Sequence, residues 1–201
     1  MTAVIYSIGI FIYQSIRKGN IMSKKDFTVT SKILMSLLAA GDMFLVTPRE
    51  LRRRLLLGQI LGDGKNFAQF VHYLAKKGFI NYVDKNNERF IKLTQKGQLE
   101  ALLAKARLPP EYKADWDGRW RLIIFDIPEE SRDKRNLFRE LLKRNSFVKL
   151  QASVFISPYA LNREAIIYLR QSGLMKYIRI LLIQEMDDDG DLRKKFNLKK
   201  Q

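Results

Sequence analysis

The stretch "RLIIFDIPEE", Arg121 to Glu130, decides the fold of the C-terminal half of this 201-residue chain. Its apolar, mostly branched or aromatic residues run almost without interruption up to one acid, Asp126. Such a run is typical of a strand at the centre of a sheet, because both faces of that strand are covered. Glu129 and Glu130 follow Pro128, where acidic residues favour a helix start. We therefore predict a central strand that carries Asp126 to the edge of a sheet.

Helical and extended patterns alternate after this strand. Helices are predicted over 131–144 and 161–173, a last strand over 177–184, and one long bent strand or two strands over 147–157. The order β-α-β-(β)-α-β predicts a ferredoxin-like domain over residues 119–186. The helical residues expected in its core are Leu137, Phe138, Leu141, Leu142, Ala165, Ile166 and Leu169.

The N-terminal half has a different order of elements. Helical patterns over 30–42, 47–58 and 65–78 precede two alternating stretches, Phe79–Val83 and Arg89–Thr94, which are separated by the turn residues Asp84–Asn87. A further helix follows "LTQKG", Leu93 to Gly97. Three helices, a hairpin and a helix predict a winged helix-turn-helix over residues 23–107, so that the whole chain is of the α+β class.

The third predicted helix has two distinct faces. Its apolar residues form one stripe, and the opposite face carries hydrogen-bond donors and positive charge, the chemistry needed to read bases in the major groove. The hairpin tip and the second helix add residues suited to phosphate contacts. The candidate DNA-binding residues are Arg52, Arg53, Arg54, Lys65, Asn66, Gln69, His72, Lys76, Lys85, Asn86 and Arg89.

Composition narrows the function. The 37 Lys and Arg residues against 21 Asp and Glu residues give a net charge of +16, which favours a nucleic-acid partner. The absence of cysteine excludes disulfides, thiol catalysis and cysteine zinc sites, and suits the cytoplasm. The single histidine, His72, excludes a histidine-based triad.

The predicted domains are joined and flanked by distinct segments. Residues 1–22 form an apolar extension whose apolar run of 11 residues, Ala3–Tyr13, is too short for a transmembrane helix, so no stable membrane insertion is expected. A new start at Met22 would explain this extension. Residues 108–118 form a linker with two prolines. Residues 187–201 form an acidic turn and a basic tail.

Two segments of the C-terminal half resemble a known family. The stretches "WDGRWRLIIFDIPEESRDKRNLFRELL", which starts at Trp116, and "LQASVFISPY", which starts at Leu150, resemble the central domain of the PaaX-type transcriptional repressors. That domain is similar to the CRISPR-associated Cas-two endonuclease. The resemblance rests on the strand ending in Asp126, on Arg132 and Arg135, and on Gln151, Ser153, Val154 and Phe155. The preceding winged helix matches the PaaX arrangement, while the repressors' further C-terminal domain has no counterpart in the sequence.

The resemblance implies two functions. As a PaaX-type repressor, the chain would bind double-stranded DNA as a homodimer without a cofactor, and its effector is unknown. As a Cas-two-like endonuclease, it would use Asp126, paired with its twin across a dimer interface, as a catalytic ligand of Mg²⁺. Within one subunit, Asp126 also fits a structural role at the end of its strand. An architectural DNA-binding protein without base specificity is a third interpretation.

Overall fold

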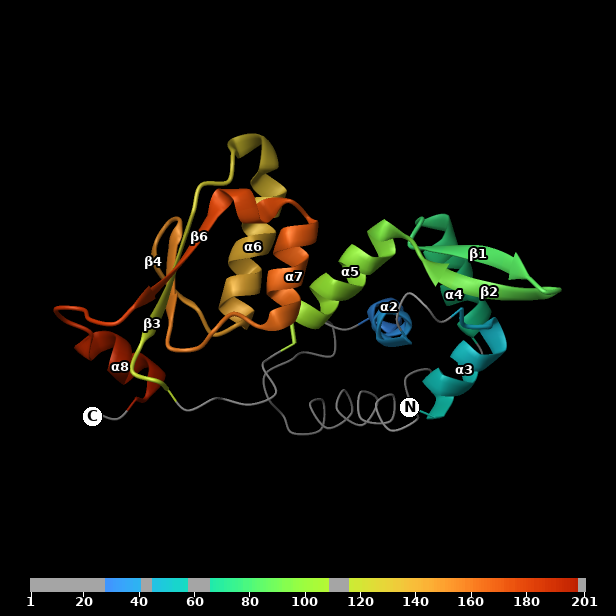
Figure 1. Cartoon of the computed structure of the whole chain (residues 1–201), viewed down its shortest axis with the longest axis horizontal. Helices are drawn as coiled ribbons and strands as arrows, with labels where there is room; N and C mark the ends of the chain where they lie inside the picture. Colours follow the sequence, from blue (N-terminus) through green and yellow to red (C-terminus); the bar gives the residue numbers. More distant parts are fainter. Residues whose placement is uncertain (1–27, 41–44, 58–65, 109–115, 199–201) are drawn as a thin grey trace. The chain divides into compact units, whose positions relative to one another are not determined.

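The computed structural model describes residues 28–40, 45–57, 66–108 and 116–198. These residues form two compact units that divide between Ala104 and Lys105 (Figure 1). The described residues contain seven α-helices and two antiparallel sheets, which confirms the predicted α+β class. The predicted extension over 1–22 and most of the predicted linker lie outside the described residues.

The first unit begins with three helices, α2 (Val29–Ala40), α3 (Pro48–Leu57) and α4 (Phe67–Lys76). The start of α3 is fixed by Thr47, whose Oγ1 accepts the backbone N–H of Glu50 at 3.2 Å. Each helix turns one apolar stripe inward, and these stripes meet in one core. Its helical members are Ile33, Leu34, Leu37, Leu51, Leu55, Phe67, Val71 and Leu74.

A hairpin follows the third helix, with strands β1 (Ile80–Lys85) and β2 (Glu88–Leu93). The turn is shorter than predicted and consists of Asn86 and Asn87, with φ of 50° and 62°. A two-residue turn of this kind matches the twist of the strands, and asparagine tolerates positive φ. Val46, before α3, forms an antiparallel bridge to Ile91 that the sequence did not predict, and its carbonyl accepts the Ile91 N–H at 2.8 Å.

The "LTQKG" motif joins the hairpin to α5 (Gln95–Ala106). Thr94 Oγ1 accepts the Gly97 N–H at 3.1 Å and donates to the Gly78 carbonyl at 2.6 Å. Gly97 is buried, and a Cβ at this position would lie 1.9 Å from the Phe79 carbonyl oxygen. The motif therefore requires glycine because the backbone of the hairpin approaches the first turn of the helix.

The second unit contains a four-stranded antiparallel sheet of order β4-β5-β3-β6. The elements, in chain order, are β3 (Trp120–Phe125), the 3-10 helix η1 (Glu129–Ser131), α6 (Arg132–Arg144), β4 (Val148–Gln151), β5 (Val154–Ser157), α7 (Arg163–Gln171), the 3-10 helix η2 (Leu174–Tyr177), β6 (Ile178–Ile183) and α8 (Gly190–Phe196). Strand β3 pairs with both β5 and β6, so the prediction of a central strand is confirmed. The extended stretch 147–157 forms two strands.

Helices α6 and α7 lie on the same side of this sheet (Figure 1). Between the sheet and α6, the Phe125 ring packs edge-on against the Phe138 ring, with 5.0 Å between the ring centres. The centre of the Phe155 ring lies 6.0 Å from that of Phe125. The predicted core residues Leu141, Leu142, Ala165 and Leu169 are buried, while Leu137 and Ile166 are half-buried. The core of this unit therefore lies between the two helices and one face of the sheet.

A hydrogen-bond cluster holds the end of α5 within the second unit. Asn145 is 2% exposed, and its Nδ2 donates to the carbonyls of Ala106 and Leu141, each at 2.9 Å. Asn162 Nδ2 donates to the same Ala106 carbonyl at 3.0 Å, and Asn162 Oδ1 caps α7 by accepting the Ala165 N–H at 2.7 Å. The last carbonyl of α5 therefore has two side-chain donors, which satisfies part of a helix end.

None of the helices that the structure describes is both long enough and apolar enough to cross a lipid bilayer.

Candidate nucleic-acid interface

The outward face of α4 carries most of the predicted base-reading side chains. Gln69, His72 and Lys76 are exposed, and Asn66 is exposed just before the first turn. The opposite face buries Phe67, Val71 and Leu74. This division follows the helical period, as expected. Lys65, the remaining candidate from this segment, lies outside the described residues.

Tyr73 belongs to the same outward face and was not predicted. Its side chain is 46% exposed, and the Lys77 ammonium lies 5.7 Å from the centre of its ring. An exposed tyrosine offers a hydroxyl donor and a flat apolar surface, both of which suit contact with a nucleic acid. The signal in the sequence was its position next to His72, which places it within one helical step of the polar face.

The three arginines of α3 differ in their surroundings. Arg52 and Arg53 are exposed, whereas Arg54 forms an ion pair with Glu50 one turn earlier. The Arg54 side chain is therefore engaged by its own helix. The exposed Arg49 lies on the same helix as Arg52 and Arg53. An open groove is lined by Pro48, Arg49, Arg52, Arg53, Leu56, Leu57 and Phe67.

The hairpin tip projects Lys85 and Asn86, which are both exposed. Arg89 is held back from the tip, since its Nε donates to Asp84 Oδ1 at 3.1 Å and its guanidinium lies 5.6 Å from the centre of the Tyr82 ring. This hydrogen bond to the Asp84 carboxylate raises the pKa of Arg89 above its already high value. Arg89 is charged, but a ligand must compete with Asp84 for it.

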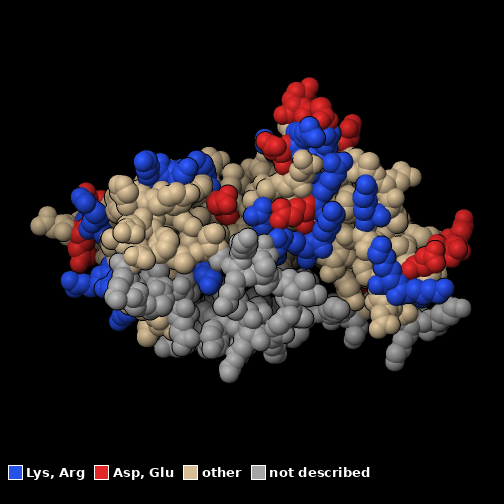
Figure 2. All heavy atoms as spheres, turned by 180° about the vertical axis from the view of Figure 1, so that it is seen from behind, with Lys and Arg blue, Asp and Glu red and all other residues tan. Residues whose placement is uncertain are grey.

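Basic residues outnumber acidic residues in the N-terminal half of the chain. Residues 23–113 contain 17 basic and 8 acidic residues. In the view of Figure 2, blue Lys and Arg atoms are spread over the molecule, whereas red Asp and Glu atoms gather in a few places. A surface of this kind attracts phosphate and makes binding dependent on salt.

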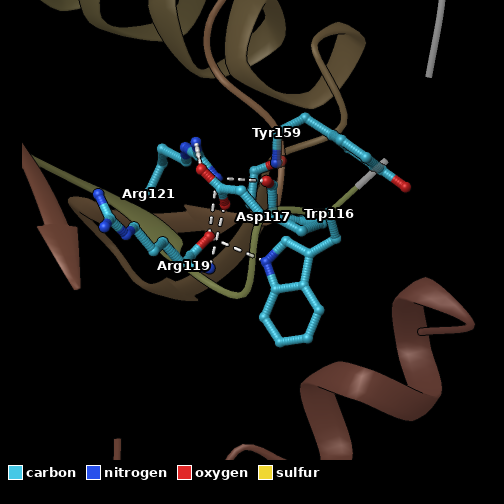
Figure 3. A network of polar contacts seen from close by, with 7 residues as sticks. Trp116, Asp117, Arg119, Arg121 and Tyr159 are labelled. Carbon is cyan, nitrogen blue, oxygen red and sulfur yellow. Dashed lines mark hydrogen bonds and ion pairs between the residues drawn. The ribbon is translucent and has the colours of Figure 1, made fainter. Parts of the chain in front are cut away.

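A second polar network, at the start of the second unit, is satisfied internally (Figure 3). Arg121 binds both carboxylate oxygens of Asp117, each at 2.6 Å, and donates to the carbonyls of Arg119 and Pro158 at 2.8 Å. Hydrogen bonding from Arg121 holds the pKa of Asp117 below its usual value. Trp116 Nε1 donates to the same Arg119 carbonyl at 2.9 Å. Because its donors and acceptors are used within the network, we assign it a structural role.

Asp126 lies at the end of β3, and its side chain is exposed. Its backbone N–H donates to the Tyr177 carbonyl at 3.0 Å, which ties the strand end to η2. Among the described residues, no group of three or more His, Asp or Glu side chains is placed to hold a metal ion. The described part of one chain therefore supplies fewer than three such side chains here, and a Mg²⁺ ion would take further ligands from water or from a second copy.

The geometry defines a basic α+β protein with an exposed polar helix face in its first unit and a four-stranded sheet in its second. Residues 113–194 match the family model of the PaaX protein central Cas2-like domain, which supports a PaaX-type protein. The match extends from the network around Trp116 into α8. The chain has no match among the curated proteins.

Proposed function

We propose that the chain is a cytoplasmic DNA-binding transcriptional regulator, a repressor of the PaaX type. Its first unit is a winged helix in which α4 reads the major groove and the β1–β2 hairpin contacts the backbone. Its second unit is a ferredoxin-like, Cas-two-like domain that joins two copies. The strand order β4-β5-β3-β6 and the β-α-β-β-α-β element order support that fold.

The exposed face of α4 is the observation that carries the proposal. Gln69 is a bidentate partner for adenine, and Lys76 is a donor to guanine or phosphate. They are held on a helix whose other face is anchored in the core by Phe67 and Leu74, so their positions are fixed by packing. Arg52 and Arg53 on α3 and Lys85 on the hairpin supply phosphate contacts on the same unit.

The second unit has an apolar surface that supports dimerisation. Ile124 on β3 and Leu181 on β6 are 40% and 42% exposed, on the sheet face opposite to α6 and α7. Ile180 and Leu182, on the outer strand β6, are 44% and 50% exposed. Three successive exposed apolar residues on an outer strand indicate a surface that a binding partner covers. A second copy fits because a two-fold repeated operator requires two recognition helices.

The test starts with selection of an operator from random double-stranded DNA by the full chain. The Gln69→Ala/Lys76→Ala variant should lose the preference for the selected operator over a scrambled duplex, because the discrimination carried by one bidentate side chain is about 1–3 kcal/mol. Fluorescence anisotropy at fixed salt gives both affinities.

The matched control is Gln171→Ala/Lys195→Ala, which removes the same two residue types from exposed positions of α7 and α8. It should keep the operator preference. If the α4 variant keeps the full preference, α4 does not read DNA and the proposal fails. If selection enriches no sequence at all, the architectural interpretation replaces the regulator.

A metal-dependent nuclease is the second candidate, and the exposed position of Asp126 at a strand end favours it. In that case the wild type cleaves duplex DNA when Mg²⁺ is added, and Asp126→Ala abolishes the cleavage while DNA binding persists. Asp191→Ala, which removes a carboxylate from another exposed position of the same unit, serves as the control. Intact DNA after prolonged incubation of the wild type with Mg²⁺ eliminates this candidate.

A further inference from the structure

Helix α6 presents a row of three positive side chains and one amide away from its buried face. Arg132, Asn136, Arg139 and Lys143 occupy positions i, i+4, i+7 and i+11, which lie above one another on a helix. Arg132, Asn136 and Lys143 are exposed, while Phe138 on the opposite side is fully buried. The row is about 16 Å long at the helical rise of 1.5 Å per residue.

Arg139 joins this row to the neighbouring strands. Its Nε and Nη2 donate to the Ala152 carbonyl, in the turn between β4 and β5, at 3.2 and 3.0 Å. Lys149 on β4 pairs in register with Phe155, whose ring packs against Phe125 on the helix-covered face of the sheet. The exposed Lys149 therefore lies on the same sheet face as α6, on the side that Arg139 contacts. We call Arg132, Asn136, Arg139, Lys143 and Lys149 the α6 stripe.

The positive charge of the C-terminal half is concentrated in this segment. Residues 132–149 contain seven basic and two acidic residues, a net charge of +5. Residues 114–201 as a whole contain 18 basic and 13 acidic residues, also a net charge of +5. The remainder of this half therefore carries equal numbers of positive and negative residues, so the excess is local to α6 and β4.

The acidic residues near α6 are already paired or lie at its first turn. Glu140 is bound by Arg144 at 3.0 Å, and Glu129 by Arg135 at 2.6 Å. Among the described residues, no carboxylate pairs with Arg132, Lys143 or Lys149. Apart from the exposed acids Glu130 and Asp133 beside its first turn, the stripe is therefore a positive surface without a carboxylate partner among the described residues.

We propose that the α6 stripe contacts the phosphate backbone of double-stranded DNA, as a second DNA-binding surface in addition to α4. This inference rests on the proposed DNA binding of the chain. The stripe contains only charged and amide side chains, which are the usual partners of phosphate oxygens, whereas protein interfaces have apolar or aromatic centres. A row of about 16 Å spans several phosphates of one strand, which succeed one another every 3.4 Å along the duplex axis.

The test is the salt dependence of DNA binding by the full chain. We expect Arg132→Gln/Lys143→Gln to reduce the slope of log K against log salt concentration by about 2, because each lost phosphate contact removes about 0.9. Its ratio of operator to scrambled-duplex affinity should equal that of the wild type, since phosphate contacts carry no sequence information. Arg139 is left intact because it also holds the Ala152 carbonyl.

The control Lys194→Gln/Lys195→Gln removes the same charge from two exposed residues of α8. An equal change of slope in both variants, or no change in the stripe variant, overturns the proposal, because net charge alone then sets the affinity. If the wild type shows no operator preference but the stripe variant shows the expected reduction of the salt slope, the proposed regulator function is refuted and the proposed phosphate contact of the stripe is supported. A wild type that binds no duplex at low salt refutes both.

Discussion

Replacement of Gly97 by alanine tests how the hairpin is held to α5. The new Cβ would lie 1.9 Å from the Phe79 carbonyl oxygen and 2.9 Å from its carbon, both of which are backbone atoms. An ordinary contact of 3.4 Å or more requires the two chain segments to separate by about 1.5 Å. The Phe79 carbonyl also accepts the Thr94 N–H at 3.0 Å, so this movement disrupts the base of the hairpin.

The expected loss of stability is about 2 kcal/mol. Overpacking of this kind costs about 1–3 kcal/mol, and the lost hydrogen bond costs about 0.5–1.5 kcal/mol. Alanine is about 1 kcal/mol better than glycine within a helix, which offsets part of the cost. For a unit of this size, about 2 kcal/mol corresponds to a fall of roughly 10 °C in the melting temperature.

The position of the tryptophans allows the two units to be followed separately. The chain has two tryptophans, Trp116 and Trp120, and both lie in the second unit. Circular dichroism at 222 nm reports the helices of both units, whereas tryptophan fluorescence reports the second. Gly97→Ala should lower the melting temperature of the first unit in the dichroism signal and leave the fluorescence midpoint unchanged.

Gly190→Ala is the matched control, because Gly190 also opens a helix. The nearest atom to a Cβ there is a side-chain oxygen of Asp188, at 3.3 Å, and this side chain can move away. Its effect should stay within about 0.5 kcal/mol. If Gly97→Ala melts at the wild-type temperature, the close approach does not constrain the fold and the reasoning is refuted.

Three further predictions concern single polar contacts. Asn145→Ala should lower the unfolding midpoint followed by fluorescence by an amount equivalent to about 1–3 kcal/mol, because the carbonyls of Ala106 and Leu141 lose the hydrogen bonds from its buried amide. An unchanged midpoint contradicts this. The pKa of Asp189 is lowered by hydrogen bonds from Arg193 and Trp120, so its contribution to stability is complete above the unfolded value of about 3.9 and is lost as pH falls below it. Asp189→Asn should therefore reduce the difference in urea midpoint between pH 6 and pH 3. Asp84→Asn should release Arg89 and tighten DNA binding at low salt, measured by anisotropy, while equal affinities would show that Arg89 makes no contact.

Elements with a strong local pattern could be predicted from the sequence. Strand β3 was identified because Leu122–Phe125 is apolar on both faces, and α4 because its apolar and polar residues separate at the helical period. Helix α8 was expected to be a turn and a basic tail. It is too short to be stable alone and depends on distant contacts, in which Trp120 Nε1 donates to Asp189 at 3.0 Å and the Trp120 ring meets Phe196 at 5.8 Å.

In the candidate DNA-binding surface too, the sequence predicted only what a local pattern determines. The exposure of Gln69, His72 and Lys76 followed from their spacing alone. The ion pairs that occupy Arg54 and Arg89 depend on rotamers and on strand register, which composition and periodicity do not reveal. The roles of these residues in DNA binding stay predictions.

The shared acceptor at Ala106 determines where the chain can be divided for biochemical work. The proline-rich segment after Arg107 looks like the natural place to cut, but a fragment that begins there lacks the carbonyl bound by Asn145 and Asn162. The buried amide of Asn145 would then lose a partner that water cannot readily replace. A stable fragment of the second unit should instead begin within α5, ahead of Lys105, and retain the last turn of that helix.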